Sequence, residues 1–273
     1  TGSIESGRID FRGTNILTLS EKEVRKLRGG NISMIFQEPA SALNPVFTIG
    51  DQIAEAVHWH QERADKSEQR ERMLEMLQTV GMPNPVRTSR QYAHELSGGM
   101  QQRAMIAMAL CANPELLIAD EPTTALDVTI QAQIMDLLQN LRESGVISSI
   151  LFITHDFGLV ADICDYVAVM YAGMVVEFAP TIELFDNPSH PYTQGLFGAL
   201  PQVRRIGEMF GIVAGMVPSM LHLPQGCPFH PRCPKVIEGM CPDNVPSARE
   251  IAPDHWVACY LFDQTPVSGD PSQ

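Results

Sequence analysis

The chain has 273 residues, of which 44% are hydrophobic and 19% are charged, a composition typical of globular rather than disordered proteins. A formal net charge of −13 without a dense lysine and arginine cluster argues against a nucleic-acid-binding surface. No apolar run approaches the ~20 residues that cross a bilayer, and the first residues lack the basic flank and apolar core of a signal peptide. Six cysteines in such a chain favour reduced thiols or a metal site over disulfides.

The N-terminal part is expected to contain short strands and amphipathic helices. Residues 19–27 predict a short charged helix, because Ser20 and Glu23 have the spacing of a capping box. The other elements follow from apolar periodicity: a strand at 9–13, a strand at 32–36 that ends at Gln37, and helices at 48–61 and 66–80.

The central part alternates helices with apolar strands. Helices are predicted at 101–112, 130–143 and 158–163, and strands at 116–119, 150–153 and 166–170. This alternation indicates a parallel sheet with helices on both faces. The longest apolar run, 167–176, is interrupted by Gly173 and is interpreted as a buried strand. After about residue 180 the sequence is rich in Pro, Gly and Cys, which indicates a small irregular appendage.

Three short motifs are the most informative feature of the chain. They are LSGGMQQR at 96–103, LLIADEP at 116–122 and ITHD at 153–156. Each alone has an ordinary explanation, such as a helix start, a strand end or a surface histidine. In this order and spacing they resemble the signature motif, the Walker B motif and the switch histidine of an ABC-type ATPase.

The resemblance implies an α/β fold, that of an ABC-type P-loop ATPase with a RecA-like parallel sheet and a helical subdomain at about 38–100. It divides the chain into an ATPase domain at 1–180 and an irregular, Cys-rich C-terminal extension of the oligopeptide-transporter type at 181–273.

Candidate catalytic residues follow the apolar strands, and ligands bind outside the carboxyl ends of parallel strands. Asp120 matches the Walker B residue that holds Mg²⁺ through water, and Glu121 matches the general base that polarises the attacking water. By resemblance, His155 contacts the γ-phosphate, and Gln37 touches Mg²⁺ and water and senses the membrane partner. A solvated acidic pair and a structural histidine are the alternatives.

Ser97, Gly98 and Gly99 open a helix, whose N-terminus offers free N–H groups to an anion. The resemblance implies that this surface, with Gln101, caps ATP held by a partner subunit, and that Asp127 faces that partner. ATP is then sandwiched in a head-to-tail dimer.

The segments 36–39, 43–45 and 119–129 look like those of dipeptide, oligopeptide and nickel importer ATP-binding subunits, and 190–193 (HPYT) strengthens the match. The resemblance implies an ATPase that drives peptide import from the cytoplasmic face of the inner membrane, as a peripheral subunit. Its expected partners are a second, non-identical ATPase, two membrane permease subunits and, indirectly, a solute-binding protein. The sequence does not identify the solute.

One family motif is missing, since Gly-x4-Gly-Lys-Ser/Thr, the Walker A phosphate loop, occurs nowhere in the chain. Relative to the family the chain lacks roughly the first 60 residues. We expect a fragment rather than a degenerate subunit, and no ATP hydrolysis by the chain as given. The alternatives are a non-catalytic partner that lends its signature motif, and a soluble ABC ATPase acting on ribosomes or DNA.

The tail contains four cysteines with irregular spacing and without the tight pairs that structural zinc sites use. The resemblance implies a [4Fe-4S] cluster on their thiolates, with zinc and free thiols as alternatives. These cysteines are Cys227, Cys233, Cys241 and Cys259, whereas Cys111 and Cys164 are interpreted as core residues.

Overall fold

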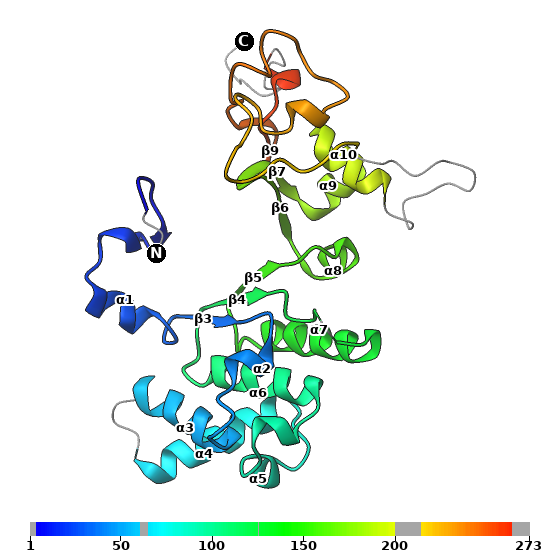
Figure 1. Cartoon of the computed structure of the whole chain (residues 1–273). Coiled ribbons are helices and arrows are strands. Elements are labelled where there is room, and N and C mark those ends of the chain that lie inside the picture. The colour runs from blue at the N-terminus through cyan, green and yellow to red at the C-terminus, as the bar shows by residue number, and fades with distance from the viewer. Residues whose placement is uncertain (1–3, 61–64, 125, 200–213, 264–273) are drawn as a thin grey trace. The chain divides into compact units, whose positions relative to one another are not determined.

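The computed structural model of the chain describes residues 4–60, 65–124, 126–199 and 214–263. The chain forms two compact units, Thr1–His155 and Asp156–Gln273 (Figure 1). Among the described residues, no helix has both the length and the apolar character needed to cross a membrane.

The first unit combines a small parallel sheet with a group of helices. Its strands are β1 (Asp10–Phe11), β2 (Thr14–Asn15), β3 (Ile32–Ile35), β4 (Leu116–Asp120) and β5 (Ser149–Ile153). Its α-helices are α1 (Glu21–Leu27), α2 (Pro39–Ala42), α3 (Ile49–His60), α4 (Lys66–Thr79), α5 (Pro85–Thr88), α6 (Gly98–Leu110) and α7 (Val128–Glu143), with short 3-10 helices at Ile16–Thr18 and Ala93–Glu95. The predicted helices and strands of this part are confirmed, except that the strand expected at 9–13 is the antiparallel pair β1–β2.

Local sequence signals explain where these elements begin. The Glu23 carboxylate accepts hydrogen bonds from the Ser20 backbone N–H at 2.8 Å and from the Ser20 hydroxyl at 2.6 Å, which confirms the capping box of α1. Asp65 caps α4 by accepting from the backbone N–H groups of Ser67 and Glu68.

The sheet order is β3-β4-β5, and all three strands are parallel. The face that carries Ile35, Leu117 and Phe152 packs against α6 and α7. The opposite face exposes apolar side chains, with Met34 36%, Leu151 51% and Ile153 44% accessible. Among the described residues of the first unit, helices therefore cover one face of this sheet rather than the two that the strand pattern predicted.

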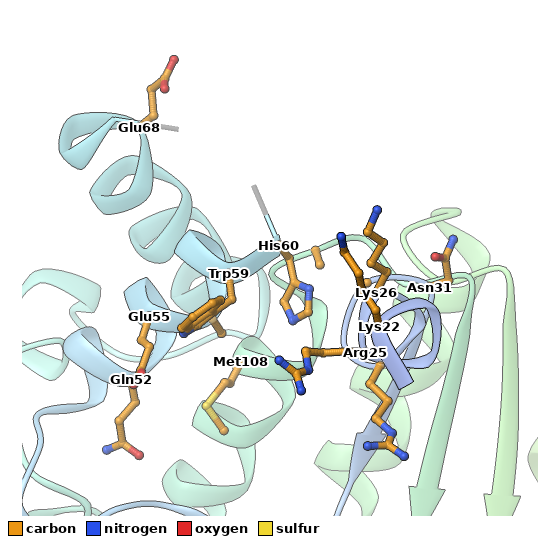
Figure 2. Close-up of a pocket in the computed structure, with 14 residues that line it drawn as sticks. Lys22, Arg25, Lys26, Asn31, Gln52, Glu55, Trp59, His60, Glu68 and Met108 are labelled. Atoms are coloured by element: carbon orange, nitrogen blue, oxygen red, sulfur yellow. The ribbon is translucent and has the colours of Figure 1, made fainter. Parts of the chain in front are cut away.

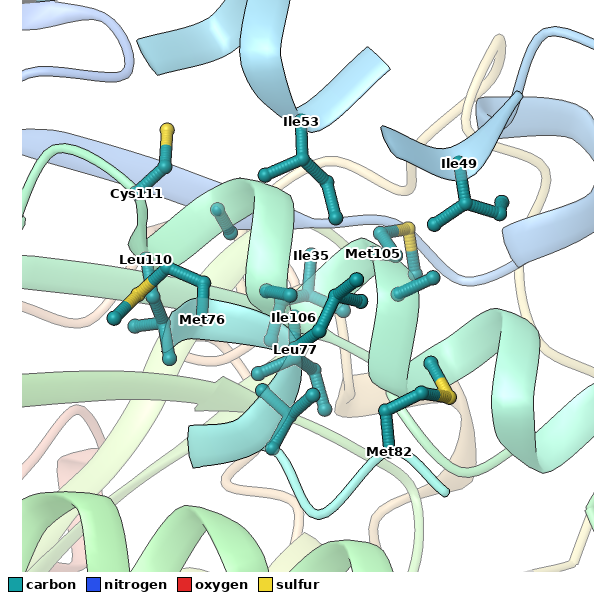
Figure 3. Packing of buried hydrophobic residues seen from close by; sticks show 14 of the residues in the cluster. Ile35, Ile49, Ile53, Met76, Leu77, Met82, Met105, Ile106, Leu110 and Cys111 are labelled. Atoms are coloured by element: carbon teal, nitrogen blue, oxygen red, sulfur yellow. The ribbon is translucent and has the colours of Figure 1, made fainter. Parts of the chain in front are cut away.

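The main core joins the sheet to the helices α3, α4 and α6 (Figure 3). Ile49 and Ile53 of α3 and Leu77 of α4 are at most 1% exposed, as their helical spacing predicted. Met105, Ile106 and Leu110 of α6 are buried to the same extent and lie among them. Cys111 is also buried here, which confirms it as a core residue.

The second unit is built around an antiparallel sheet with the order β6-β7-β9-β8. Its strands are β6 (Tyr166–Tyr171), β7 (Met174–Pro180), β8 (Arg249–Ala252) and β9 (His255–Val257). Its helices are α8 (Phe157–Ile163), α9 (Thr181–Asp186) and α10 (Pro191–Gly198), with short 3-10 helices at His230–Arg232 and Tyr260–Phe262.

The single strand predicted at 167–176 is wrong, because the structure forms a hairpin there. Tyr171 pairs with Met174 across a two-residue turn, and Ala172 and Gly173 have φ values of 49° and 80°. Two consecutive positive φ values match the twist of tight antiparallel hairpins. Strand β6 therefore belongs to the antiparallel sheet, not to the parallel one.

A buried acid connects the segments of this second unit. Glu177 of β7 accepts hydrogen bonds from the backbone N–H of Ser189 at 2.7 Å and of His190 at 3.0 Å. The Nε2 atom of His255 in β9 lies 2.8 Å from the same carboxylate. Glu177 and both histidines are 1% exposed. A buried carboxylate without these partners would be strongly unfavourable, so the network fixes β7, β9 and the start of α10 together.

Candidate active site

The ends of three neighbouring strands bring the predicted catalytic residues together. Gln37 follows β3, Asp120 ends β4, and His155 follows β5. In the parallel pairing of β4 with β5, Asp120 lies opposite Ile153. The backbone N–H of Glu121 continues the pairing with a 2.9 Å hydrogen bond to the carbonyl of Ile153. The parallel register therefore places all these residues at one edge of the sheet, as expected from the sequence.

Glu121 is the centre of this cluster. Its Oε2 atom accepts hydrogen bonds from Gln37 Nε2 at 2.6 Å and from Thr124 Oγ1 at 2.8 Å. Its Oε1 atom lies 2.9 Å from His155 Nδ1. The bond from His155 and then that from Thr124 hold the pKa of Glu121 below its usual value. The carboxylate is therefore ionised and able to accept a proton.

His155 and Asp120 leave polar atoms available to a ligand. The His155 side chain is 77% exposed, and its Nδ1 faces Glu121, so Nε2 is left for another contact. Among the residues that the structure describes, the Asp120 side chain makes no hydrogen bond and no ion pair. Its carboxylate oxygens and the amide oxygen of Gln37 are the hard donors that Mg²⁺ prefers.

The signature residues lie at the N-terminus of α6. The Ser97 side chain caps this helix by accepting from the Met100 backbone N–H. Gly99 packs tightly, because an added Cβ would lie 2.7 Å from Ile130 Cγ2 of α7. A Cβ at Gly98 would instead make an ordinary contact of 3.6 Å with Leu126.

Two other predicted binding residues have structural partners. The side-chain amide of Gln101 donates to the carbonyls of Ala93 at 2.8 Å and Leu96 at 3.4 Å, so it holds the loop before the signature motif. Asp127 is exposed and caps α7 by accepting from Ile130 N–H at 3.0 Å. Because Ile130 also contacts Gly99, Asp127 and the signature motif lie near each other. The structure gathers Gln37, Asp120, Glu121 and His155 in a separate cluster.

A large cavity lies elsewhere in the first unit, between α1 and the C-terminal half of α3 (Figure 2). Its volume is about 1530 Å³. Basic side chains of α1 form one side of it, and Trp59 and His60 of α3 form the other. Burial lowers the pKa of His60, which keeps this ring neutral at pH 7. The basic residues that line the cavity are Lys22, Arg25, Lys26 and Arg28, and the acidic ones are Glu55 and Glu68.

Two features of the site were missed in the sequence. Thr124 lies in the 116–127 segment, three residues after Glu121, and its spacing from Glu121 is the signal for the contact between the two side chains. The basic side of the cavity could have been predicted from the sequence, because four of the seven residues 22–28 are basic in a chain of net negative charge.

The prediction of an iron–sulfur cluster in the tail is wrong. Across the described residues, which include all four tail cysteines, no group of three or more His, Cys, Asp or Glu side chains is arranged to hold a metal ion. Burial raises the pKa of Cys227, Cys233 and Cys259, the last to about 11. A raised pKa adds to the free-energy cost of forming the thiolates that metal ligation needs.

Comparison with known proteins identifies the family. Residues 2–124 match the family model described as ABC transporter, and residues 176–241 match that of the C-terminal region of oligopeptide/dipeptide transporters. The chain is 48% identical over 275 residues to a putative peptide import ATP-binding protein of Brucella ovis, covering 96% of this chain and 80% of that protein. It is 46% identical to the dipeptide transport ATP-binding protein DppD of Bacillus subtilis, covering 97% of this chain and 78% of that protein. The chain belongs to the ATP-binding proteins of the ABC transporter family.

Solved structures of ABC cassettes confirm the predicted fold of this ABC protein. The dimeric, post-hydrolysis cassette MJ0796 bound to ADP and Pi has a TM-score of 0.57 and 28% identity, covering 65% of this chain and 74% of that one. The cassette cbiO1 of Clostridium perfringens has a TM-score of 0.57 and 29% identity, covering 67% and 69%. Family membership also confirms the predicted ATPase class and the use of ATP with Mg²⁺.

Proposed function

We propose that this chain is the ATP-hydrolysing subunit of an ABC importer of peptides. The hydrogen-bonded cluster around Glu121 supports hydrolysis, because it places an ionised carboxylate beside a free Asp120 and an exposed histidine at the strand ends. Peptide as the solute is supported by the relatives, whose names specify peptide, dipeptide or oligopeptide transport. A non-catalytic partner subunit would not need a general base in this arrangement.

The residues divide the work of phosphoryl transfer, which consists largely of positioning and charge stabilisation. Asp120 and the Gln37 amide oxygen would hold Mg²⁺, which would offset the negative charge of the phosphates. His155 offers Nε2 to the γ-phosphate. Glu121 accepts a proton from the attacking water, for which its ionised state is required.

The signature surface acts on a second nucleotide. Ser97, Gly98 and Gln101 stand at the start of α6, apart from the Glu121 cluster, so they cap ATP held by another subunit. Asp127 faces the same partner. MJ0796 is dimeric, which supports this pairing. In the importer the second ATPase is a non-identical subunit.

The basic cavity is the docking site for an acidic cytoplasmic segment of a membrane permease subunit. At about 1530 Å³ it exceeds the size of ordinary small-molecule pockets, which reach roughly 1,000 Å³. Its four basic and two acidic lining residues make it locally positive in a chain of net charge −13, and the exposed Trp59 adds an aromatic anchor. Such docking places the chain peripherally on the cytoplasmic face of the inner membrane. Solute reaches the permease from a solute-binding protein.

Reconstitution tests the proposed function. The transporter is assembled in proteoliposomes with this subunit in its full encoded length, its partner ATPase, the permease subunits and the solute-binding protein. We expect labelled di- or oligopeptide uptake that requires ATP, and ATP hydrolysis that the loaded solute-binding protein stimulates. Hydrolysis without any peptide uptake would contradict the importer assignment, and an absence of hydrolysis would contradict the catalytic one.

Charge reversal tests the docking site. Lys22→Glu with Arg25→Glu is expected to reduce co-purification of the permease subunits, because it inverts one wall of the cavity. Arg87→Glu with Arg90→Glu makes the same charge change at exposed residues outside the cavity and serves as control. Equal co-purification of both double variants would refute the assigned surface.

A further inference from the structure

Thr124 is bound to Glu121 within a single turn of chain. The backbone N–H of Thr124 donates to the Glu121 carbonyl at 3.1 Å, and its hydroxyl donates to Glu121 Oε2 at 2.8 Å. Glu121 itself has a φ of +43°, in the left-handed region that non-glycine residues rarely adopt. Its N–H is held by the carbonyl of Ile153 at 2.9 Å. The turn therefore fixes both the backbone and one carboxylate oxygen of Glu121.

The other two partners of Glu121 come from distant parts of the chain. Gln37 is exposed and lies 84 residues away in sequence, and His155 is 77% exposed and 34 residues away. Both are residues whose polar atoms the proposed mechanism needs for Mg²⁺ and the γ-phosphate. Gln37 and His155 are thus shared between Glu121 and the nucleotide, whereas Thr124 is the side-chain partner of the carboxylate to which that mechanism gives no second ligand.

We propose that Thr124 is a positioning residue for the general base, an inference that rests on the proposed hydrolytic function. Its hydroxyl holds Oε2 of Glu121, so that the lone pair of Oε1 that does not face His155 Nδ1 is directed at the attacking water. Glu121 accepts one proton from that water at Oε1. The water oxygen forms a bond to the γ-phosphorus, and the bond from that phosphorus to the bridging oxygen breaks, with ADP leaving with the electron pair.

The test compares Thr124→Val with Thr124→Ser in the assembled transporter, with the catalytic carboxylate of the partner ATPase inactivated. Valine keeps the branched shape without the hydroxyl, whereas serine keeps the hydroxyl. We expect Thr124→Val to lower kcat about tenfold with little change in the KM for ATP, and Thr124→Ser to stay within about twofold of wild type. Thr79→Val removes a hydroxyl from an exposed helical site and serves as control.

A double variant separates positioning from structural damage. If Thr124 acts through Glu121, adding Thr124→Val to Glu121→Gln lowers kcat no further, whereas independent effects multiply. Thermal unfolding shows whether each variant is folded, and Thr124→Ala, which also lacks the hydroxyl, takes the place of Thr124→Val if the valine variant is not. The inference is overturned by wild-type kcat in Thr124→Val, by an equal loss in Thr124→Ser, or by a change in KM alone. Wild-type hydrolysis in the same preparation tests the proposed function separately.

Discussion

Gln37 Nε2 and Glu121 Oε2 lie 2.6 Å apart, although 84 residues separate them in the sequence. The contact joins the end of β3 to the end of β4, two adjacent parallel strands. It means that a residue proposed to bind Mg²⁺ and sense the membrane partner also holds the proposed base. Movement of Gln37 toward a ligand therefore changes the hydrogen bonding of Glu121 directly.

In the assembled transporter, with the catalytic carboxylate of the partner ATPase inactivated, Glu121→Gln is expected to lower ATP hydrolysis about 100-fold or more while preserving ATP binding. The amide keeps the size of the side chain but cannot take the proton from water. Hydrolysis is measured as phosphate release, and binding with labelled ATP, which should accumulate in a closed dimer. Near-wild-type turnover would assign the base to another residue, with His155 the next candidate.

Gly99→Ala is expected to destabilise the first unit, whereas Gly98→Ala is its matched control. The new methyl at Gly99 would lie 2.7 Å from Cγ2 of Ile130, a stiff β-branched side chain, but the one at Gly98 has 3.6 Å of room. Overpacking of this kind lowers the free energy of unfolding by about 1–3 kcal/mol. The Tm should therefore fall in Gly99→Ala but not in Gly98→Ala.

The clash itself can be tested by a third change. Ile130→Ala removes the atom that Gly99→Ala meets, so the cost of Gly99→Ala should shrink in that background. The same cost in both backgrounds would show that Ile130 is not the reason for glycine at this position.

The sequence alone predicts an element or a site when its signal is local, or when polar residues follow the ends of apolar strands. Ser20 and Glu23 located α1, and polar residues after three apolar strands located the Gln37, Glu121 and His155 cluster. The hairpin at Ala172–Gly173 was missed because a continuous apolar run hides a two-residue turn that lacks Asn and Pro.

Other features depend on tertiary contacts that spacing does not encode. Pairing of β7 with β9 joins residues about 80 positions apart, and only the fold brings Glu177 beside His255. Glu177 did have a sequence signal, since it is a charge inside an apolar strand. For the tail cysteines, the sequence predicted more than the structure shows. The family resemblance implied an iron–sulfur cluster, but the arrangement of the cysteine side chains does not support one.

Glu177→Gln is expected to destabilise the second unit by about 2 kcal/mol. Both carboxylate oxygens accept hydrogen bonds from N–H groups, so an amide NH₂ in place of one oxygen leaves a buried donor facing a donor. Glu183→Gln is the control, because this side chain is 39% exposed and lies 3.8 Å from His255. Urea unfolding followed by Trp256 fluorescence, in a Trp59→Phe background, reports the second unit. Equal midpoints for the two variants would contradict the role of Glu177.

His190→Asn is expected to make the second unit less sensitive to acid. Burial lowers the pKa of His190 to about 4, an effect that the nearby Glu177 charge partly opposes. In the unfolded chain the pKa is near 6.5, so between pH 6.5 and 4 the unfolded state binds the proton and the folded state does not. Stability is therefore retained above pH 6.5 and falls by about 3 kcal/mol as the pH drops to 4.

Asparagine removes this titration but keeps the helix cap. His190 Nδ1 accepts from the Tyr192 backbone N–H at 3.0 Å, and the Asn side-chain oxygen accepts in the same position. Urea unfolding at pH 7, 6, 5 and 4.5 should therefore show a smaller decrease in the unfolding free energy for His190→Asn than for wild type. His222→Asn, at an exposed histidine, should keep the wild-type slope. If His190→Asn retains the full acid slope, the buried histidine is not the group whose protonation destabilises this unit.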